Sequence, residues 1–133
     1  MAIENYFLPQ SLEEAVGLLA EHGPSLLVMA GGTIAMPLIN DGISLPEQVM
    51  GLRQAGLSYV DRANGRVSIG ATTTLTQLLD LEVVPMLQEA ARHTAGWSIR
   101  NLGTVGGNIL APPPAADVAA AWLALDASVK LVS

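Results

Sequence analysis

The chain has 133 residues, half of them hydrophobic, which is enough for one folded domain or a domain and part of a second. Its net charge of -6 argues against a nucleic-acid partner, because binding to a phosphate backbone requires a basic patch. The absence of cysteine excludes disulfides, thiolate-bound metals and iron–sulfur clusters held by this chain. Two histidines are too few for a convincing metal site.

The sequence does not indicate export or membrane insertion. Its first residues lack the basic and apolar regions of a signal peptide. The longest apolar run, residues 118–125, is far shorter than the ~20 residues that span a bilayer. We therefore expect a cytoplasmic protein with no transmembrane segment.

The first predicted elements are a helix, a strand, a glycine turn and a short helix. Ser11 and Glu14 form a capping-box pattern, in which the Ser11 hydroxyl accepts from the Glu14 amide and the Glu14 side chain reaches back. Apolar residues at helical spacing continue from there to a stop at Gly23-Pro24. We then predict a buried strand over 26–30, a short helix over 36–39 and a second strand, beside the first, over 49–52.

The centre of the chain carries the clearest local signal, a β-hairpin. Residues 57–61 and 66–70 alternate apolar and polar side chains about Asn64-Gly65, a dipeptide that favours a tight turn. One of the threonines at 72–74 can cap the next helix. The later predicted elements are a helix through Leu79, a helix over 86–93, an extended stretch at Pro112–Pro114, a helix over 115–125 and a strand from Ser128.

Two glycine segments are the main functional signal. They are Ala30-Gly31-Gly32-Thr33 and Gly103-Thr104-Val105-Gly106-Gly107-Asn108. Because glycine has no Cβ, the backbone can turn sharply there and aim several amides at one point, which suits a phosphate. Two such segments, each with a threonine hydroxyl, predict a ligand with two adjacent phosphates.

Each of these residues also fits a role without a ligand. The glycines are compatible with tight turns, bulges or close backbone approaches. Thr33 and Thr104 fit helix caps and phosphate contacts equally well, and Asn108 fits a turn that bonds its own backbone. Asp117 would be favoured in the first turn of a helix in any case.

Other side chains are assigned no cofactor chemistry. We expect Arg100, the cation beside the second glycine segment, to contact a carboxylate or a carbonyl rather than a phosphate. Trp97 and Trp122 are expected in the core or at an interface. The sequence shows no nucleophile–base pair and no paired carboxylates, so any difficult chemistry belongs to a cofactor.

Several segments, in order along the chain, carry a family resemblance. Together they resemble the FAD-binding domain of molybdenum hydroxylases, such as the medium subunit of carbon monoxide dehydrogenase and the flavin domain of xanthine dehydrogenase. Each motif is modest alone, but their order along nearly the whole chain is specific. The matching segments are Tyr6 to Ala15, Ala30 to Thr33, Val67 to Thr74, Ile99 to Ile109, and Ala115 to Asp117.

The resemblance implies an α+β fold of the vanillyl-alcohol-oxidase (PCMH) type, in which two α/β subdomains clasp FAD. Residues 1–55 would form the N-terminal subdomain with the first glycine turn. Residues 56–133 would form the second subdomain with the second glycine turn. Because family members continue well past this length, we expect the second subdomain to be truncated.

By motif position, the resemblance implies that the two glycine segments hold the FAD diphosphate. Leu110 would lie near the flavin ring, and Asp117 would bind cofactor hydroxyls. No catalytic residue and no metal ligand is implied. The implied cofactor-binding residues are Val28, Met29, Ala30, Gly31, Gly32, Thr33, Thr104, Gly107, Asn108, Leu110 and Asp117.

The implied function is that of an oxidoreductase component that transfers electrons. FAD would take electrons from iron–sulfur clusters on one partner subunit and deliver them to NAD or another acceptor. Substrate oxidation would occur at the molybdenum cofactor of a second partner subunit.

Two departures from the family's pattern support an alternative. Ile34 stands where the family usually has Asp or Ser, which removes a polar contact, and Pro112–Pro114 replaces a more polar stretch. The alternative function is a flavin-free structural subunit that keeps the fold and serves in assembly. A weaker alternative is a binder of another diphosphate, such as a nucleotide.

Overall fold

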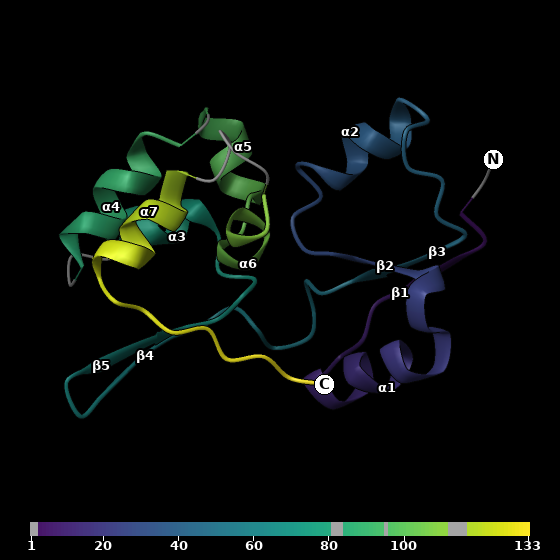
Figure 1. The fold of residues 1–133 in the computed structure, drawn as a ribbon, viewed down its shortest axis with the longest axis horizontal. Helices are drawn as coiled ribbons and strands as arrows, with labels where there is room; N and C mark the ends of the chain where they lie inside the picture. The colour runs from purple at the N-terminus through teal and green to yellow at the C-terminus, as the bar shows by residue number, and fades with distance from the viewer. Residues whose placement is uncertain (1–2, 81–83, 95, 112–116) are drawn as a thin grey trace.

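The structure, a computed structural model, describes residues 3–80, 84–94, 96–111 and 117–133 (Figure 1). Its elements form two lobes that lie side by side (Figure 1). The N-terminal lobe contains the elements of residues 5–51, and the C-terminal lobe contains those of residues 60–124.

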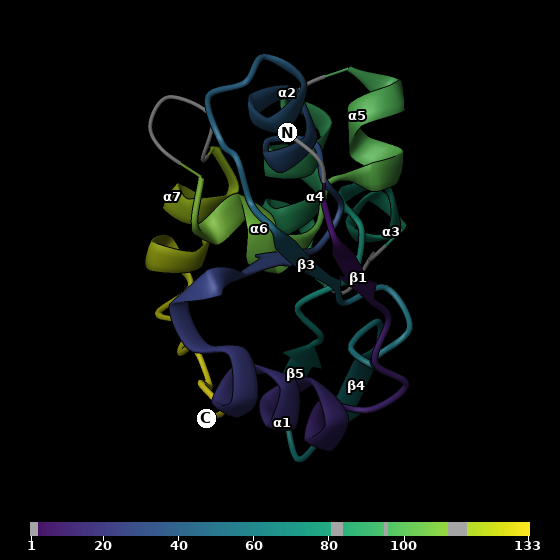
Figure 2. The same ribbon diagram turned by 90° about the vertical axis from the view of Figure 1, so that its right-hand side faces the viewer.

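The N-terminal lobe is built on a parallel three-stranded sheet with the order β1-β3-β2. Leu27 of β2 faces Val49 of β3, so the predicted pairing of these two strands is confirmed. Helices α1 and α2 lie on opposite sides of the sheet (Figure 2). The elements are β1 (Asn5–Phe7), α1 (Leu12–His22), the 3-10 turn η1 (Gly23–Ser25), β2 (Leu26–Met29), α2 (Ala35–Asn40) and β3 (Gln48–Gly51).

The start of α1 follows the predicted cap only in part. The Ser11 hydroxyl accepts from the Glu14 amide at 3.1 Å, as predicted. The Glu14 carboxylate, however, accepts from the amide of Gln10 at 2.9 Å rather than from that of Ser11. Ser11 has an extended backbone (φ -152°, ψ 162°), which brings the preceding amide within reach of the carboxylate.

Strand β2 is less buried than its apolar sequence predicts. Leu26 is buried, but the Val28 side chain is 41% exposed. The reason is position, because β3 occupies the centre of the sheet and β2 forms an edge. Leu26 packs with Ala15 of α1 and Met50 of β3, and these residues form the core of the N-terminal lobe.

The C-terminal lobe joins a hairpin to a group of short helices. The predicted turn is confirmed, since Asn64 and Gly65 both have a positive φ between antiparallel strands. Thr74 caps the next helix by accepting from the Gln77 amide. The elements are β4 (Val60–Ala63), β5 (Arg66–Ile69), α3 (Leu75–Leu79), α4 (Pro85–Arg92), α5 (Trp97–Leu102), α6 (Val105–Ile109) and α7 (Asp117–Ala124).

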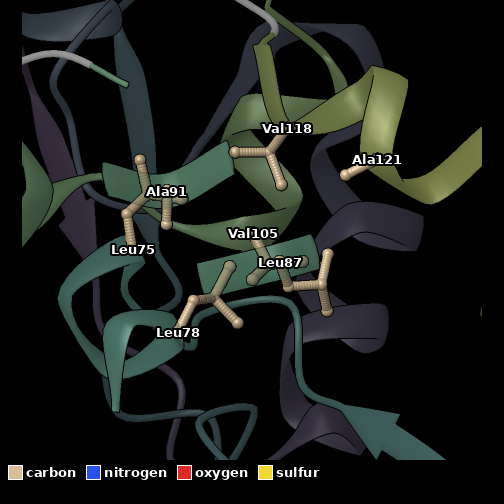
Figure 3. Close-up of a cluster of buried hydrophobic side chains, with 7 residues drawn as sticks. All are labelled: Leu75, Leu78, Leu87, Ala91, Val105, Val118 and Ala121. Carbon is tan, nitrogen blue, oxygen red and sulfur yellow. The ribbon is translucent and has the colours of Figure 1, made fainter. Parts of the chain in front are cut away.

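The C-terminal lobe has a hydrophobic core of its own, in which side chains from α3, α4, α6 and α7 converge (Figure 3). Leu78 and Val118 are completely buried there. The buried members are Leu75, Leu78, Leu87, Ala91, Val105, Val118 and Ala121. This cluster shares no residue with the core of the N-terminal lobe, so each lobe has a separate core.

Some sequence predictions for the C-terminal lobe are wrong. Residues 127–133 form neither strand nor helix, and Leu131 is 88% exposed, because no strand among the described residues pairs with this segment. Of the two positions predicted for the tryptophans, the core is excluded for Trp97, which is 71% exposed, so that an interface stays its prediction; Trp122 packs against the core. The extended stretch predicted at Pro112–Pro114 lies outside the described residues.

Candidate cofactor site

A cavity of about 400 Å³ lies between the two lobes. Its walls come from the segment around β2 and α2 on one side, and from α5, α6 and their neighbours on the other. Its size falls at the lower end of the range for ligand pockets. The predicted cofactor-binding residues whose side chains the structure describes all line it: Val28, Met29, Ala30, Gly31, Gly32, Thr33, Thr104, Gly107, Asn108 and Leu110.

The first glycine turn presents a run of available amides. Within the described part of the chain, none of the backbone N–H groups of residues 31–35 donates a hydrogen bond. Gly32 has φ +74°, a left-handed conformation that favours glycine. Its carbonyl accepts from the Met36 amide at 3.0 Å and so connects the turn to α2. Consecutive free amides in such a turn form a donor set for an anion.

The second glycine segment differs from its prediction, because Gly106, Gly107 and Asn108 are part of helix α6. Of its amides, all except that of Thr104 donate hydrogen bonds to groups of the protein that the structure describes. The Val105 and Gly106 amides donate to the carbonyls of Thr73 and Ala71 at 2.9 and 2.8 Å. The Gly107 amide donates to the Thr104 hydroxyl at 3.1 Å. The glycine amides of this segment are therefore already used inside the protein and do not form a run of available donors like that of the first turn.

Gly106 instead allows a close backbone approach. A Cβ on this residue would lie 3.1 Å from both the Cβ and the carbonyl oxygen of Ala71. This glycine therefore lets α6 pack against the loop that follows the hairpin.

The second segment contributes side chains to the cavity. Thr104 is predicted to cap a helix or to contact a phosphate, and it is the N-cap of α6. Its side chain is buried, with the residue 6% exposed. Asn108 is buried in α6 and also lines the cavity. Leu110 is 86% exposed, which places an apolar side chain at the mouth of the cavity. Asp117 is the first residue of α7, and its side chain lies outside what the structure describes.

The cavity has no charged wall among the residues that the structure describes. Arg100 is the cation nearest in sequence to the second segment, and it donates to the carbonyl of Arg92 at 2.9 Å. This carbonyl contact is one of the two predicted for it. An anion in the cavity would therefore be held by neutral dipoles.

Sequence reasoning missed part of the lining. Thr94 is buried and donates its hydroxyl hydrogen bond to the carbonyl of Ala90 at 2.8 Å. Ile34, where a polar residue was expected, lines the cavity with a 41% exposed apolar side chain. No local pattern identifies these positions, because they reach the cavity only through packing. The missed lining residues are Leu27, Ile34, Ala35, Leu38, Ser44, Leu75, Thr94, Ile99 and Ala111, whereas Gly103, which also lines the cavity, belongs to the predicted glycine segment.

The features of the cavity suit part of a dinucleotide cofactor. The open amides provide donors for phosphate oxygens, and the buried Thr104 and Asn108 line the same cavity. Apolar residues occupy much of the remaining wall, as is common in cofactor pockets.

Comparison with known proteins assigns the family. The alpha subunit of the 6-hydroxypseudooxynicotine dehydrogenase complex from Paenarthrobacter nicotinovorans is 35% identical over 97% of this chain and 45% of its own length. The carbon monoxide dehydrogenase medium chain from Hydrogenophaga pseudoflava is 33% identical over 92% of this chain and 44% of its own. The chain therefore spans less than half the length of these relatives.

A solved structure supports the same relationship. Carbon monoxide dehydrogenase from Hydrogenophaga pseudoflava aligns with a TM-score of 0.78 and 32% identity, covering 81% of this chain and 39% of the solved one. In the described residues, we find no helix with the length and apolar character that a membrane crossing requires. Residues 1–133 match the family described as the FAD binding domain in molybdopterin dehydrogenase, and the chain belongs to that family.

Proposed function

We propose that this chain is the FAD-binding part of an electron-transfer subunit in a molybdenum hydroxylase-type dehydrogenase. Electrons would arrive from iron–sulfur clusters on one partner subunit and leave to NAD or another external acceptor. Substrate would be oxidised at the molybdenum cofactor of another partner subunit. The observation that carries the proposal is the run of available amides at residues 31–35, which belongs to the same cavity lining as the buried Thr104 and Asn108.

The proposed roles of the two walls differ. The amides that follow Ala30 donate to the diphosphate oxygens, with the Thr33 hydroxyl beside them. The Thr104 hydroxyl accepts from the Gly107 amide, so its own O–H is left to donate to a phosphate oxygen. Asn108 supplies a polar side chain on the same wall.

The other predicted residues surround this polar centre. Val28 and Met29 lead into the first turn and contribute apolar wall. Leu110 would lie near the flavin ring, and Asp117 would bind cofactor hydroxyls. When bound, FAD accepts and releases electrons, while the protein supplies its binding, orientation and electrostatic environment.

We also propose that the chain consists of the two subdomains expected from the family resemblance. Residues 1–55 and 56–133 would be the two subdomains of a PCMH-type fold. Their separate hydrophobic cores support this division. The cofactor would then lie between the subdomains and contact both.

The direct test is reconstitution of the purified chain with FAD, followed by a visible spectrum and identification of the released cofactor. We expect flavin absorbance, and release of FAD rather than FMN, because the amide run suits a diphosphate. A chain that stays colourless with excess FAD refutes the proposal and leaves the flavin-free assembly role. ADP that binds as tightly as FAD would indicate a general diphosphate binder instead.

A matched pair of variants tests the second wall. Thr104→Val removes the hydroxyl, and we expect FAD affinity to fall about tenfold or more, since a hydrogen bond to a charged group contributes ~1.5–3 kcal/mol. Thr104→Ser keeps both the cap and the donor and should bind normally. Thr76→Val is the control, because the Thr76 hydroxyl bonds Asn101 outside the cavity lining. Unchanged binding by Thr104→Val would contradict a phosphate contact.

A further inference from the structure

Gly31 is the point at which the two lobes meet at backbone distance. A Cβ on Gly31 would overlap the carbonyl oxygen of Leu102 and would lie 2.7 Å from its carbonyl carbon. The same Cβ would lie 3.3 Å from the backbone nitrogen of Gly103. Because all three are main-chain atoms, they cannot swing aside as the end of a flexible side chain can. We call this contact between Gly31 and the Leu102 carbonyl the joint.

The C-terminal side of the joint is held firmly. The Gly103 amide donates to the Ile99 carbonyl at 2.6 Å, and the Gly103 carbonyl accepts from the Leu75 amide at 2.9 Å. Leu102 ends α5, and Gly103 directly precedes Thr104 on the cavity wall. A displacement at the joint would therefore move the whole wall and not Leu102 alone.

The extensive packing in the described residues lies within the lobes rather than between them. Each hydrophobic core lies within one lobe. The pairs of helices and strands that pack extensively within the described residues also belong to one lobe each. The joint therefore has a large influence on the width of the cavity between them.

We propose that Gly31 is a positioning residue: its lack of a side chain seats the first glycine turn on the Leu102 carbonyl and so sets the distance between the amide run and Thr104. This inference rests on the proposed function for its effect on FAD. The effect on lobe separation does not depend on any ligand. Gly31→Ala should move the lobes apart and weaken FAD binding by about tenfold, because the diphosphate then loses hydrogen bonds to one wall.

Gly32 provides a contrast at the next residue. A Cβ there would meet only side-chain atoms, Met36 Cγ at 3.2 Å and Met29 Sδ at 3.3 Å. Gly32 therefore has no close main-chain contact with the other lobe. Leu102→Ala is the matched control and should leave the lobe separation unchanged, because the joint uses the carbonyl of Leu102 and its side chain is 60% exposed.

The chain has no cysteine, so two spin labels can be placed without removing native thiols. We would introduce Glu13→Cys in α1 and Ser98→Cys in α5, both exposed positions in different lobes, and measure the distance distribution between the labels without FAD. We expect a shifted or broadened distribution in Gly31→Ala alone. Circular dichroism would establish that each variant retains its helices.

An unchanged distribution in Gly31→Ala overturns the inference, whether or not FAD affinity falls. If FAD binding falls without a shift, Gly31 is a phosphate ligand and not a positioning residue. Should Gly31→Ala fail to fold, the wild type still tests the joint, through nuclear Overhauser contacts between the Gly31 α protons and the Gly103 amide proton. Their absence would also overturn the inference. If Gly31→Ala shifts the distribution as expected but the wild type binds no FAD, only the proposed function is refuted.

Discussion

Replacing Gly32 by alanine tests whether the conformation of the first glycine turn is used in binding. Gly32 has φ +74°, where a residue with a Cβ is strained by ~1–2 kcal/mol. The nearest atoms to the new Cβ belong to Met29 and Met36 side chains, which can move. The main effect of the substitution is therefore backbone strain rather than steric overlap.

This strain has a defined consequence for binding. In the free protein the turn can relax out of the left-handed conformation, and the amides of residues 31–35 then point elsewhere. FAD must restore the strained conformation, so binding loses the same ~1–2 kcal/mol. That loss corresponds to a decrease in affinity of about 5- to 30-fold.

The assay is titration of the chain with FAD, followed by the change in flavin fluorescence. Gly65→Ala is the matched control, because Gly65 also has φ +74°, has open space around it and lies in the hairpin turn away from the cavity lining. Denaturant unfolding would show similar destabilisation for this control, whereas its FAD affinity should equal that of the wild type. If Gly32→Ala also binds FAD like the wild type, the amides of this turn do not hold the cofactor.

The remaining predictions concern electrostatics, packing and pH. Because no charged residue among those described lines the cavity and the net charge is -6, added salt should leave FAD affinity unchanged or raise it, and a steep fall would reveal a cationic contact. Leu78→Ala and Met50→Ala each remove a fully buried side chain, leave a cavity and should lower the free energy of unfolding by ~2–5 kcal/mol. Because the two residues lie in separate cores, the loss measured for the double variant by denaturant unfolding should equal the sum of the two single losses to within ~0.5 kcal/mol. A larger deviation would contradict independent cores. The hydrogen bond from His93 is the main cause that lowers the pKa of Glu89, opposed by desolvation and aided by Arg92. The ionised Glu89 carboxylate therefore contributes to the free energy of unfolding at pH values above its ordinary pKa, and this contribution is lost as the pH falls through its lowered pKa. His93→Ala should raise the Glu89 pKa in a carboxyl NMR titration, and an unchanged pKa would contradict the contact.

Local sequence signals predicted many elements because those elements depend on near neighbours. The Ser11 hydroxyl bonds the Glu14 amide, and Asn64-Gly65 forms the hairpin turn, without help from distant residues. The expected strand from Ser128 failed for the opposite reason. A strand requires a partner, and no pairing strand is present for this segment among the described residues.

By itself, the sequence determined the family resemblance, the two glycine segments and about half of the residues that line the cavity, because glycine and capping patterns are local properties. Only the tertiary structure decided which of the two glycine segments has backbone N–H groups that are not already hydrogen-bonded within the protein. The Val105 and Gly106 amides are occupied by carbonyls of Thr73 and Ala71, far away in sequence, whereas residues 31–35 meet no such acceptor in the described chain. A backbone amide is available or occupied according to which distant carbonyl packs beside it, and that depends on the fold as a whole.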